Sequence, residues 1–320
     1  MSGERSLDES LLHAIDIALK AGRLLRRRLA FKRRVRYKGR IDLVTEADKA
    51  SEDLIFGALR RGFPDDDVLS EEGSNRATNS ARRWVVDPLD GTTNYAHGIS
   101  FFCVSIALQV AGRVELGIVF APIHDELFVA RRGHGAFLVV DDGLRALGEK
   151  RPLPLPAPLF DRPHAPSRTC GPSVCRFQFV ASQRPHGARL VPHGGPPGIM
   201  RLRVSAVSSL HRAILVTGFP YDVHLHPGNY FRWFRRFCMA AQAVRRLGSA
   251  AIDMCYVAAG RLDGFWESKL HAWDTAAAQL IVEEAGGRVT DFSGRPFDMF
   301  GTETLASNGR VHRRMVETLR

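Results

Sequence analysis

The chain begins with a helical repeat of apolar positions. Within residues 6–29, Leu11, Ile15, Ala18 and Leu25 recur at intervals of three, four and seven behind a polar start, a spacing that places them on one face of a helix. A second helical pattern runs over 49–61 and stops where glycine and proline follow. We therefore expect two amphipathic helices near the N-terminus.

Short apolar runs then replace the helical pattern. Val68 and Leu69 form one short run, and residues 101–110 and 114–120 form two longer runs separated by a glycine-containing turn. This arrangement predicts a hairpin, to which residues 126–130 add a further strand. The first lobe should consist of several antiparallel strands beside two helices.

The last third of the chain alternates between the two patterns. Apolar runs at 213–216, 262–266 and 288–290 are typical of strands, and the stretches between them carry helical spacing. We expect the aromatic residues of the helix at 229–241 to lie in the core. Alternating helices and strands predict an α/β second lobe. The helices should cover the ranges 229–241, 249–259 and from about 273 to 285.

Residues 139–200 interrupt this regularity. The segment holds most of the 17 prolines and shows no sustained period of either kind. We expect it to be a disordered, dispensable insertion between an N-terminal lobe, 1–138, and a C-terminal lobe, 201–320. A zinc site is an alternative, although the ligand spacing matches no standard pattern. Its ligands would come from Cys170, Cys175, His164, His186 and His193.

The composition is typical of a globular protein without a disulfide framework or a membrane-spanning segment. The hydrophobic content of 45% is ordinary for a globular chain, and the five cysteines have no framework-like spacing. No apolar run is long enough to cross a membrane, and the N-terminus lacks the apolar core of a secretory signal. We expect a cytoplasmic protein with reduced thiols.

The net charge of +11 raises the question of nucleic-acid binding. Much of it lies between Arg23 and Arg40. No aromatic interleaving or nucleic-acid motif accompanies these arginines, and an arginine-rich helix end followed by a solvated strand would have the same composition. Specific nucleic-acid binding is therefore not the expected function.

The candidate chemistry begins where a buried strand breaks into a turn. Asp87 and Asp90 stand three residues apart after an apolar run, with Pro88 between them and Gly91 after them. Oxygen ligands of this kind select Mg²⁺, Mn²⁺ or Ca²⁺, and the backbone N–H groups after Gly91 suit a phosphate. The alternative is that Asp-Pro and Asp-Gly simply form turns.

Other acidic residues near predicted element ends also have ordinary explanations. Asp274 could be the N-cap of its helix, and Glu71 could belong to a solvated turn. Ser105, Cys103 and His97 lie near the same motif. A nucleophilic role for them is not expected, because no partnered base accompanies them.

These residues resemble the inositol monophosphatase family of metal-dependent sugar phosphatases. The resemblance rests on DPLDGTTNY at 87–95, LSEEGS at 69–74, and WDTAAA at 273–278 with EAGG at 284–287. Two weaker motifs extend it, DLVT at 42–45 with Asp48, and LGSAA at 247–251. The motifs occur in the family's order and cover nearly everything except 139–200.

The resemblance implies a layered αβαβα fold with the active site between the lobes. It also implies roles for individual residues. The ligands of two or three Mg²⁺ ions would be Glu71, Asp87, the backbone carbonyl of Leu89, Asp90 and Asp274. Gly91 and Thr92 would contact phosphate, and Ala250 and Glu267 would contact the rest of the substrate. Glu71 and Thr92 would activate the attacking water, and Asp48 would orient the threonine.

The implied reaction is Mg²⁺-dependent hydrolysis of a small polyol phosphate, with myo-inositol 1-phosphate favoured. Two cations roughly 3.5–4 Å apart can clamp the attacking water and the leaving oxygen of an in-line displacement. Other sugar or nucleotide phosphatases are alternatives, as is a basic RNA-associated binding protein. The expected partner is a small phosphorylated molecule, with no membrane partner, and the family's tendency towards dimers makes a homodimer possible.

Overall fold

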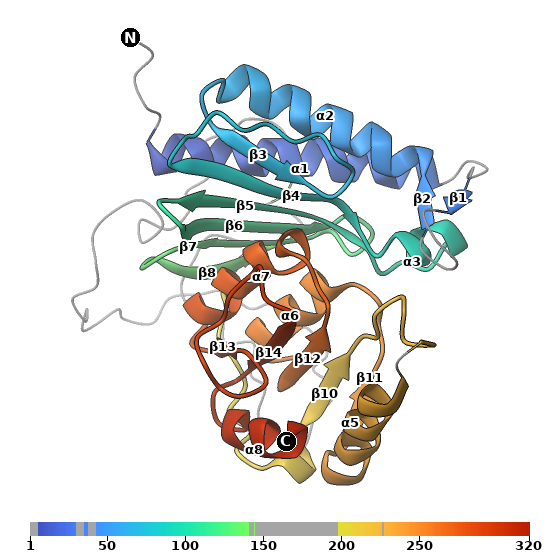
Figure 1. The fold of residues 1–320 in the computed structure, drawn as a ribbon. Coiled ribbons are helices and arrows are strands. Elements are labelled where there is room, and N and C mark those ends of the chain that lie inside the picture. Colours follow the sequence, from blue (N-terminus) through green and yellow to red (C-terminus); the bar gives the residue numbers. More distant parts are fainter. Residues whose placement is uncertain (1–5, 30–34, 38–42, 141–143, 145–197, 226) are drawn as a thin grey trace, which may run out of the picture.

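A computed structural model describes residues 6–29, 35–37, 43–140, 144, 198–225 and 227–320. Helices and sheets alternate in five layers (Figure 1). Helices α1 and α2 cover one face of a seven-stranded sheet, α6 and α7 lie between that sheet and a five-stranded one, and α5 and α8 lie beyond the second sheet. The predicted layered αβαβα fold of mixed α/β class is confirmed.

The two N-terminal helices form where the periodicity predicts them. Helix α1 spans Leu7–Leu29 and α2 spans Glu46–Gly62. Helix α2 starts in a capping box, in which Thr45 Oγ1 accepts a hydrogen bond from Ala47 N and Asp48 accepts one from Thr45 N. Two short strands, β1 (Val35–Tyr37) and β2 (Leu43–Thr45), pair beside them.

The large sheet has the order β3-β4-β5-β6-β7-β8-β9 and is antiparallel except where β3 runs parallel to β4. The predicted hairpin is confirmed as β5 and β6, and the next strand as β7. The parallel pair was not predicted. The strands are β3 (Asp67–Ser70), β4 (Arg82–Asp90), β5 (Cys103–Val110), β6 (Arg113–Ala121), β7 (Glu126–Arg131), β8 (Gly135–Val139) and β9 (Ile199–Arg201).

Both faces of this sheet are buried. Val85 packs into the core shared with α6 and α7, whereas Val86 packs into the core under α1 and α2. Successive residues of a strand point to opposite faces, so a strand covered on both sides must be apolar throughout. This requirement accounts for the unbroken apolar runs in the sequence.

The second sheet has the order β11-β10-β12-β14-β13, with its first three strands parallel and its last three antiparallel. The strands are β10 (Ile214–Thr217), β11 (Ala243–Arg245), β12 (Gly264–Ser268), β13 (Arg288–Thr290) and β14 (Glu303–Ser307). The remaining helices are α3 (Thr92–His97), α5 (Pro227–Ala240), α6 (Ala250–Ala258), α7 (Ala272–Glu284), α8 (His312–Leu319) and the 3₁₀ turn η2 (Leu210–Arg212).

The aromatic residues of α5 correct one prediction. Phe237 is fully buried, with its ring centroid 4.1 Å from that of Trp266, but Phe231 is 56% exposed. Helix α5 lies in the outermost layer (Figure 1), so a single face of it can reach the core. The expectation that the whole cluster is core was therefore wrong.

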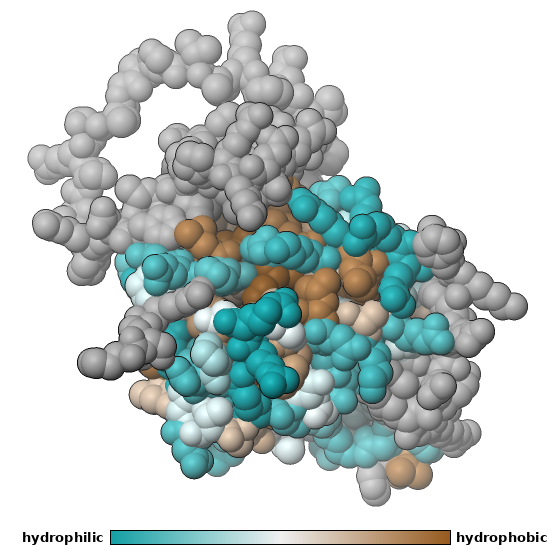
Figure 2. Space-filling view, turned by 90° about the horizontal axis from the view of Figure 1, so that it is seen from above, coloured by the Kyte–Doolittle hydropathy of each residue, from teal (hydrophilic) through white to brown (hydrophobic). Residues whose placement is uncertain are grey.

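The surface offers no membrane-crossing element among the described residues, since none of their helices is long and apolar enough. Viewed from the side of α1 and α2, the coloured surface is largely hydrophilic, with hydrophobic residues gathered in limited patches (Figure 2). Leu12 on α1, 45% exposed, is one of the large apolar side chains that remain accessible. Scattered exposure of this kind is normal for globular proteins.

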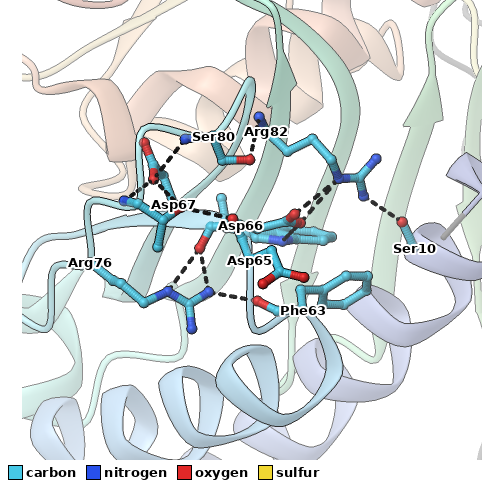
Figure 3. Close-up of polar contacts among 10 residues, drawn as sticks. Ser10, Phe63, Asp65, Asp66, Asp67, Arg76, Ser80 and Arg82 are labelled. Atoms are coloured by element: carbon cyan, nitrogen blue, oxygen red, sulfur yellow. Dashed lines mark hydrogen bonds and ion pairs between the residues drawn. The ribbon is translucent and has the colours of Figure 1, made fainter. Parts of the chain in front are cut away.

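A buried ion pair fixes β3 and β4 against the N-terminal helices (Figure 3). Asp66 accepts hydrogen bonds from Arg82 Nε at 3.1 Å and from Trp84 Nε1 at 2.8 Å, and Arg82 donates to Ser10 Oγ on α1 at 2.8 Å. Arg76 donates to the backbone carbonyls of Asp66 and Phe63. The start of β3, the strand that leads to Glu71, is thus tied to three other elements.

Replacing Asp66 by alanine should destabilise the fold by about 3–5 kcal/mol, because it leaves the Arg82 charge buried without its partner. Urea denaturation of the two proteins measures this loss. Asp16→Ala is the control, since Asp16 pairs with Lys20 on the exposed surface of α1 and its loss should matter little. Equal effects of the two substitutions would contradict the assignment.

The ends of the predicted insertion meet at one edge of the large sheet. Strands β8 and β9 pair antiparallel, with Val139 opposite Ile199, and Val140 N donates to Gly198 O at 2.8 Å. The strands on either side of the segment are therefore direct neighbours in the sheet. Residues 139, 199 and 200 belong to the strands, whereas the disorder and the zinc alternative predicted for this segment concern positions outside the described residues.

Joining Val140 to Gly198 through a short turn, in place of 141–197, should leave the fold intact and lower its thermal midpoint by only a few degrees, because Leu144 of the core under α1 and α2 is lost with the segment. The two backbone ends are already hydrogen bonded, so a turn there needs no rearrangement of the sheet. Circular dichroism and thermal unfolding of the shortened chain test this. A chain that no longer folds would show that the segment is not dispensable.

Candidate functional site

A cleft of about 1060 Å³ opens between the two lobes. Its walls come from the turn after β3, the end of β4, the start of α3, the start of α6, the end of β12 and the start of α7. Residues that are almost two hundred positions apart in sequence therefore face one space. The predicted residues that line it are Glu71, Asp87, Leu89, Asp90, Gly91, Thr92, Ala250, Glu267 and Asp274.

Three carboxylates converge on one part of the cleft. Asp87 and Asp90 end β4, where the register with β5 is irregular, and Asp274 comes from the first turn of α7. One ligand oxygen from each lies within 4.8 Å of the others. An oxygen-only set of this kind fits a hard divalent cation such as Mg²⁺ and does not resemble a zinc site.

Hydrogen bonds hold the carboxylates of Asp90 and Asp87 in place. Asp90 Oδ2 accepts hydrogen bonds from Ser249 Oγ at 2.6 Å and from Ala251 N at 2.8 Å, at the start of α6. Asp87 Oδ1 accepts from Leu89 N at 2.9 Å, which holds the turn between the two aspartates. These bonds fix both carboxylates before any ligand binds.

Asp274 is the third residue of α7 rather than its N-cap. The N-cap is His271, and Asp274 Oδ2 accepts a hydrogen bond from His271 N at 2.7 Å. The N-cap interpretation of Asp274 was therefore wrong, although the residue does close the helix start. Asp274 lies in the first turn of α7 and lines the cleft.

Burial and neighbouring carboxylates raise the pKa values of Asp87 and Asp90. Burial is the largest cause for Asp87, followed by the charges of Glu71, Asp90 and Asp274, and its pKa lies well above the usual range. Burial and then the charge of Asp274 raise the pKa of Asp90 to about 6, against hydrogen bonds from Ser249 and Ala251 that lower it. A cation among these groups would relieve their repulsion.

Glu71 is positioned by a buried neighbour that the sequence did not single out. Glu52 on α2 accepts hydrogen bonds from Ser70 Oγ at 2.8 Å and from Ser74 N at 2.9 Å, on either side of Glu71. The backbone N–H of Glu71 donates to Val86 O at 3.3 Å. The turn carrying Glu71 is thereby held against β4, beside Asp87.

Thr92 and Asp48 form a buried relay. Thr92 Oγ1 lies 3.0 Å from Asp48 Oδ1 and 3.0 Å from Leu89 O, both acceptors, and Asp48 Oδ2 accepts from the Thr45 hydroxyl. Asp48 is 1% exposed, and burial raises its pKa. Asp48 is thus buried at the start of α2, within hydrogen-bond distance of Thr92.

Gly91 permits a close approach of backbone at the start of α3. Its φ is 91°, and a Cβ there would lie 2.9 Å from Phe101 O. Asn94, which the sequence did not single out, donates from Nδ2 to Phe101 O at 2.7 Å and to Leu247 O at 2.8 Å. This amide ties the Gly91 turn to the segment that enters α6.

Glu267 also lines the cleft, from strand β12. A Cβ on Gly218 would lie 2.0 Å from Glu267 Oε1, so the carboxylate occupies the space that this glycine leaves. Burial raises the pKa of Glu267 to about 8; the charge of Arg246 lowers it, and those of Asp274 and Asp90 raise it. Arg246, Asp253 and Gly218 also line the cleft and were missed by the sequence reasoning.

Cys103 does not supply a nucleophile. It is fully buried, and burial first, then the charge of Asp90, raises the pKa of its thiol well above the usual range. A thiol in that setting stays protonated. This burial agrees with the expectation that Cys103 has no nucleophilic role.

A model of the inositol monophosphatase family matches residues 6–156 and 176–320. The chain belongs to the inositol monophosphatase family. It is 34% identical to an inositol-1-monophosphatase of Mesorhizobium japonicum over 96% of this chain and 94% of that protein. It is 36% identical to Nus factor SuhB of Pasteurella multocida, over 88% and 84% of the two chains.

Solved structures agree with this assignment. The extragenic suppressor protein SuhB of Bartonella henselae has a TM-score of 0.74 at 34% identity, with 96% of this chain and 97% of that chain covered. An inositol monophosphatase of Anabaena has a TM-score of 0.71 at 33% identity, covering 98% and 96%. The resemblance found in the motifs is confirmed, and membership of a metal-dependent phosphatase family supports phosphatase activity.

Mg²⁺ should stabilise this protein more at pH 8 than at pH 5. In the metal-free protein the pKa values of Asp90 and Glu267 are raised to about 6 and about 8. Their contribution to stability is complete below their unfolded pKa values near 4 and is lost as pH rises through the folded ones. Mg²⁺ binds only to ionised carboxylates. It therefore adds most to the stability of the protein at the higher pH, where these groups have lost their protons.

Thermal unfolding with and without Mg²⁺ at both pH values measures this difference. At a hundred times its dissociation constant Mg²⁺ should raise the midpoint by about 4 °C at pH 8. The Mg²⁺-induced shift is the quantity to compare, because His312, whose pKa burial lowers to about 4, adds an opposite pH dependence to both samples. Equal shifts at the two pH values would contradict the prediction.

Proposed function

We propose that this protein hydrolyses a small polyol phosphate in a Mg²⁺-dependent reaction, with myo-inositol 1-phosphate as the preferred substrate. The observation that carries the proposal is the convergence of Asp87, Asp90 and Asp274 within 4.8 Å in a cleft that also holds Glu71 and Thr92. The relatives named inositol-1-monophosphatase support the choice of substrate.

In this proposal Glu71, Asp87, the Leu89 carbonyl, Asp90 and Asp274 are the cation ligands. Bound Mg²⁺ would neutralise the phosphate and lower the pKa of an adjacent water. The sequence-predicted set includes no histidine or cysteine, which matches the donors that Mg²⁺ prefers. The number of ions, two or three, is taken from the family resemblance; Glu71 and Asp274 reach this cleft from different elements.

The remaining steps are assigned to the chain's own groups. Glu71 would accept the proton of the attacking water, as a general base held beside the phosphate. Thr92 lines the cleft, and its Oγ1, which donates to Asp48 Oδ1 or Leu89 O, would accept a hydrogen bond from that water and orient it. The backbone N–H groups at Gly91 and Thr92 would hold the phosphate oxygens.

Ala250 and Glu267 would contact the alcohol. Glu267 is half-buried, and its carboxylate fills the space beside Gly218, which limits its orientation. A carboxylate there accepts hydrogen bonds from hydroxyl groups, and these bonds would distinguish a polyol from an apolar alcohol.

Asp90→Asn should lower kcat/KM roughly a thousandfold in the presence of Mg²⁺, because several kcal/mol of charge stabilisation is lost with one ligand. The amide oxygen can keep the bonds from Ser249 and Ala251, so the fold should survive. Phosphate release measured with and without Mg²⁺ tests this. Undiminished turnover in the variant would refute the assignment of the site.

The substrate is tested on the wild-type protein. Phosphate release should be fastest with myo-inositol 1-phosphate and slower with fructose 1,6-bisphosphate, 3′-phosphoadenosine 5′-phosphate and histidinol phosphate. Faster hydrolysis of one of the other three would move the assignment to that substrate class.

A second function, binding of RNA-associated machinery, is favoured by one observation. Relatives of this chain carry the name Nus factor SuhB, and exposed arginines gather on α5 and β11. These arginines are Arg232, Arg235, Arg236 and Arg245, with Arg246 next to the cleft. Absence of turnover with all four substrates would favour this function over hydrolysis.

A further inference from the structure

A buried acidic side chain that the proposed reaction does not use faces the cleft. Asp253 lies on α6, is 1% exposed and lines the cleft. Its Oδ1 is buried and has no hydrogen-bond partner among the described residues. Because an unpartnered carboxylate oxygen is costly to bury, this atom marks a place where a donor from outside the chain fits.

Asp253 lines the same cleft as Glu267 and Arg246. The charges of Glu267 and Asp90 act on it, together with the opposite charge of Arg246, and Arg246 acts in the same way on Glu267. Ser268 Oγ, next to Glu267 in β12, is likewise buried without a partner within the described part of the chain and belongs to the same cleft.

This set of groups suits a neutral polyol. Two carboxyl groups accept hydrogen bonds from hydroxyls, and one guanidinium donates to a hydroxyl oxygen. A second phosphate or a carboxylate on the alcohol brings no donor for the two carboxyl groups, so it fits this pair less well than hydroxyl groups do. The unpartnered atoms are then satisfied only when neighbouring hydroxyls are present.

We propose that Asp253 is a specificity-determining residue, whose Oδ1 accepts a hydrogen bond from one hydroxyl of the alcohol while Glu267 accepts one from another. The ligand class is a monophosphate of a neutral polyol with adjacent hydroxyl groups. This inference rests on the proposed phosphatase function, and it adds a residue and a selection rule that the function alone does not contain.

The test compares myo-inositol 1-phosphate with p-nitrophenyl phosphate, whose alcohol has no further hydroxyl, in the presence of Mg²⁺. The selectivity is the ratio of the two kcat/KM values. Asp253→Ala should lower it roughly tenfold or more, mainly through a higher KM for the inositol ester. Asp253→Asn keeps an acceptor oxygen of the same size and should retain most of the selectivity.

Asp263→Ala is the matched control. Asp263 is also a buried carboxylate, but it accepts hydrogen bonds from Ser205 Oγ and from Ile214 N at 2.7 Å, and it does not line the cleft. Its loss should lower the thermal midpoint and leave the selectivity within about twofold of wild type. A merely structural role for Asp253 would give the same result as this control.

Monodeoxy analogues of inositol 1-phosphate keep the test decisive if Asp253→Ala does not fold. Removal of one particular hydroxyl from the substrate should lower the kcat/KM of the wild type roughly tenfold. The same removal should lower the kcat/KM of Asp253→Asn by the same factor, because this variant keeps the acceptor. If Asp253→Ala does fold, removal of the same hydroxyl from the substrate should lower its kcat/KM only slightly.

Two results would overturn the inference alone, with the proposed function intact. One is an unchanged selectivity in Asp253→Ala, and the other is equal losses in the alanine and asparagine variants. If the wild type hydrolyses neither ester, the proposed function fails and the inference falls with it.

Discussion

The carboxylate of Asp90 joins the two lobes. It belongs to the end of β4 in the first lobe, and its Oδ2 accepts hydrogen bonds from Ser249 and Ala251 at the start of α6 in the second. Asn94 adds a second link to the same segment through Leu247 O. Because both links are buried at the cleft, the arrangement of the lobes and the geometry of the carboxylate cluster depend on the same few bonds. A variant that disturbs one should therefore disturb the other.

Close packing of α7 on the large sheet extends this constraint to Asp274. A Cβ on Gly117 would lie 2.5 Å from Ala277 O, and the side chains of α7 that face the sheet are mostly alanines. Backbone lies against backbone there, so α7 cannot slide without a clash. The position of the Asp274 carboxylate relative to the end of β4 is consequently fixed, although the two segments are far apart in the sequence.

Local patterns were sufficient to predict much of this structure. Helical spacing gave α1 and α2, the turn at 111–113 gave the β5–β6 hairpin, and the strand-to-turn break predicted that Asp87 and Asp90 share a site. Their approach to Asp274 came from the family resemblance alone, because no local pattern carries contacts between distant segments. The parallel pairing of β3 with β4 was missed for the same reason. Asp253 was missed although one signal exists, since it is the single charged residue in an otherwise apolar helix.

The position of the β8–β9 junction bears on how this chain can change in length. In the strand order the junction lies at the edge of the sheet opposite β3, and β4, which carries Asp87 and Asp90, lies next to β3. Neighbouring strands are about 4.8 Å apart, so four strand spacings place the attachment points on the order of 20 Å from the carboxylates. Residues gained or lost at that edge leave every hydrogen bond between β3 and β8 in register. Evolution can therefore vary the chain there without adjusting the cleft.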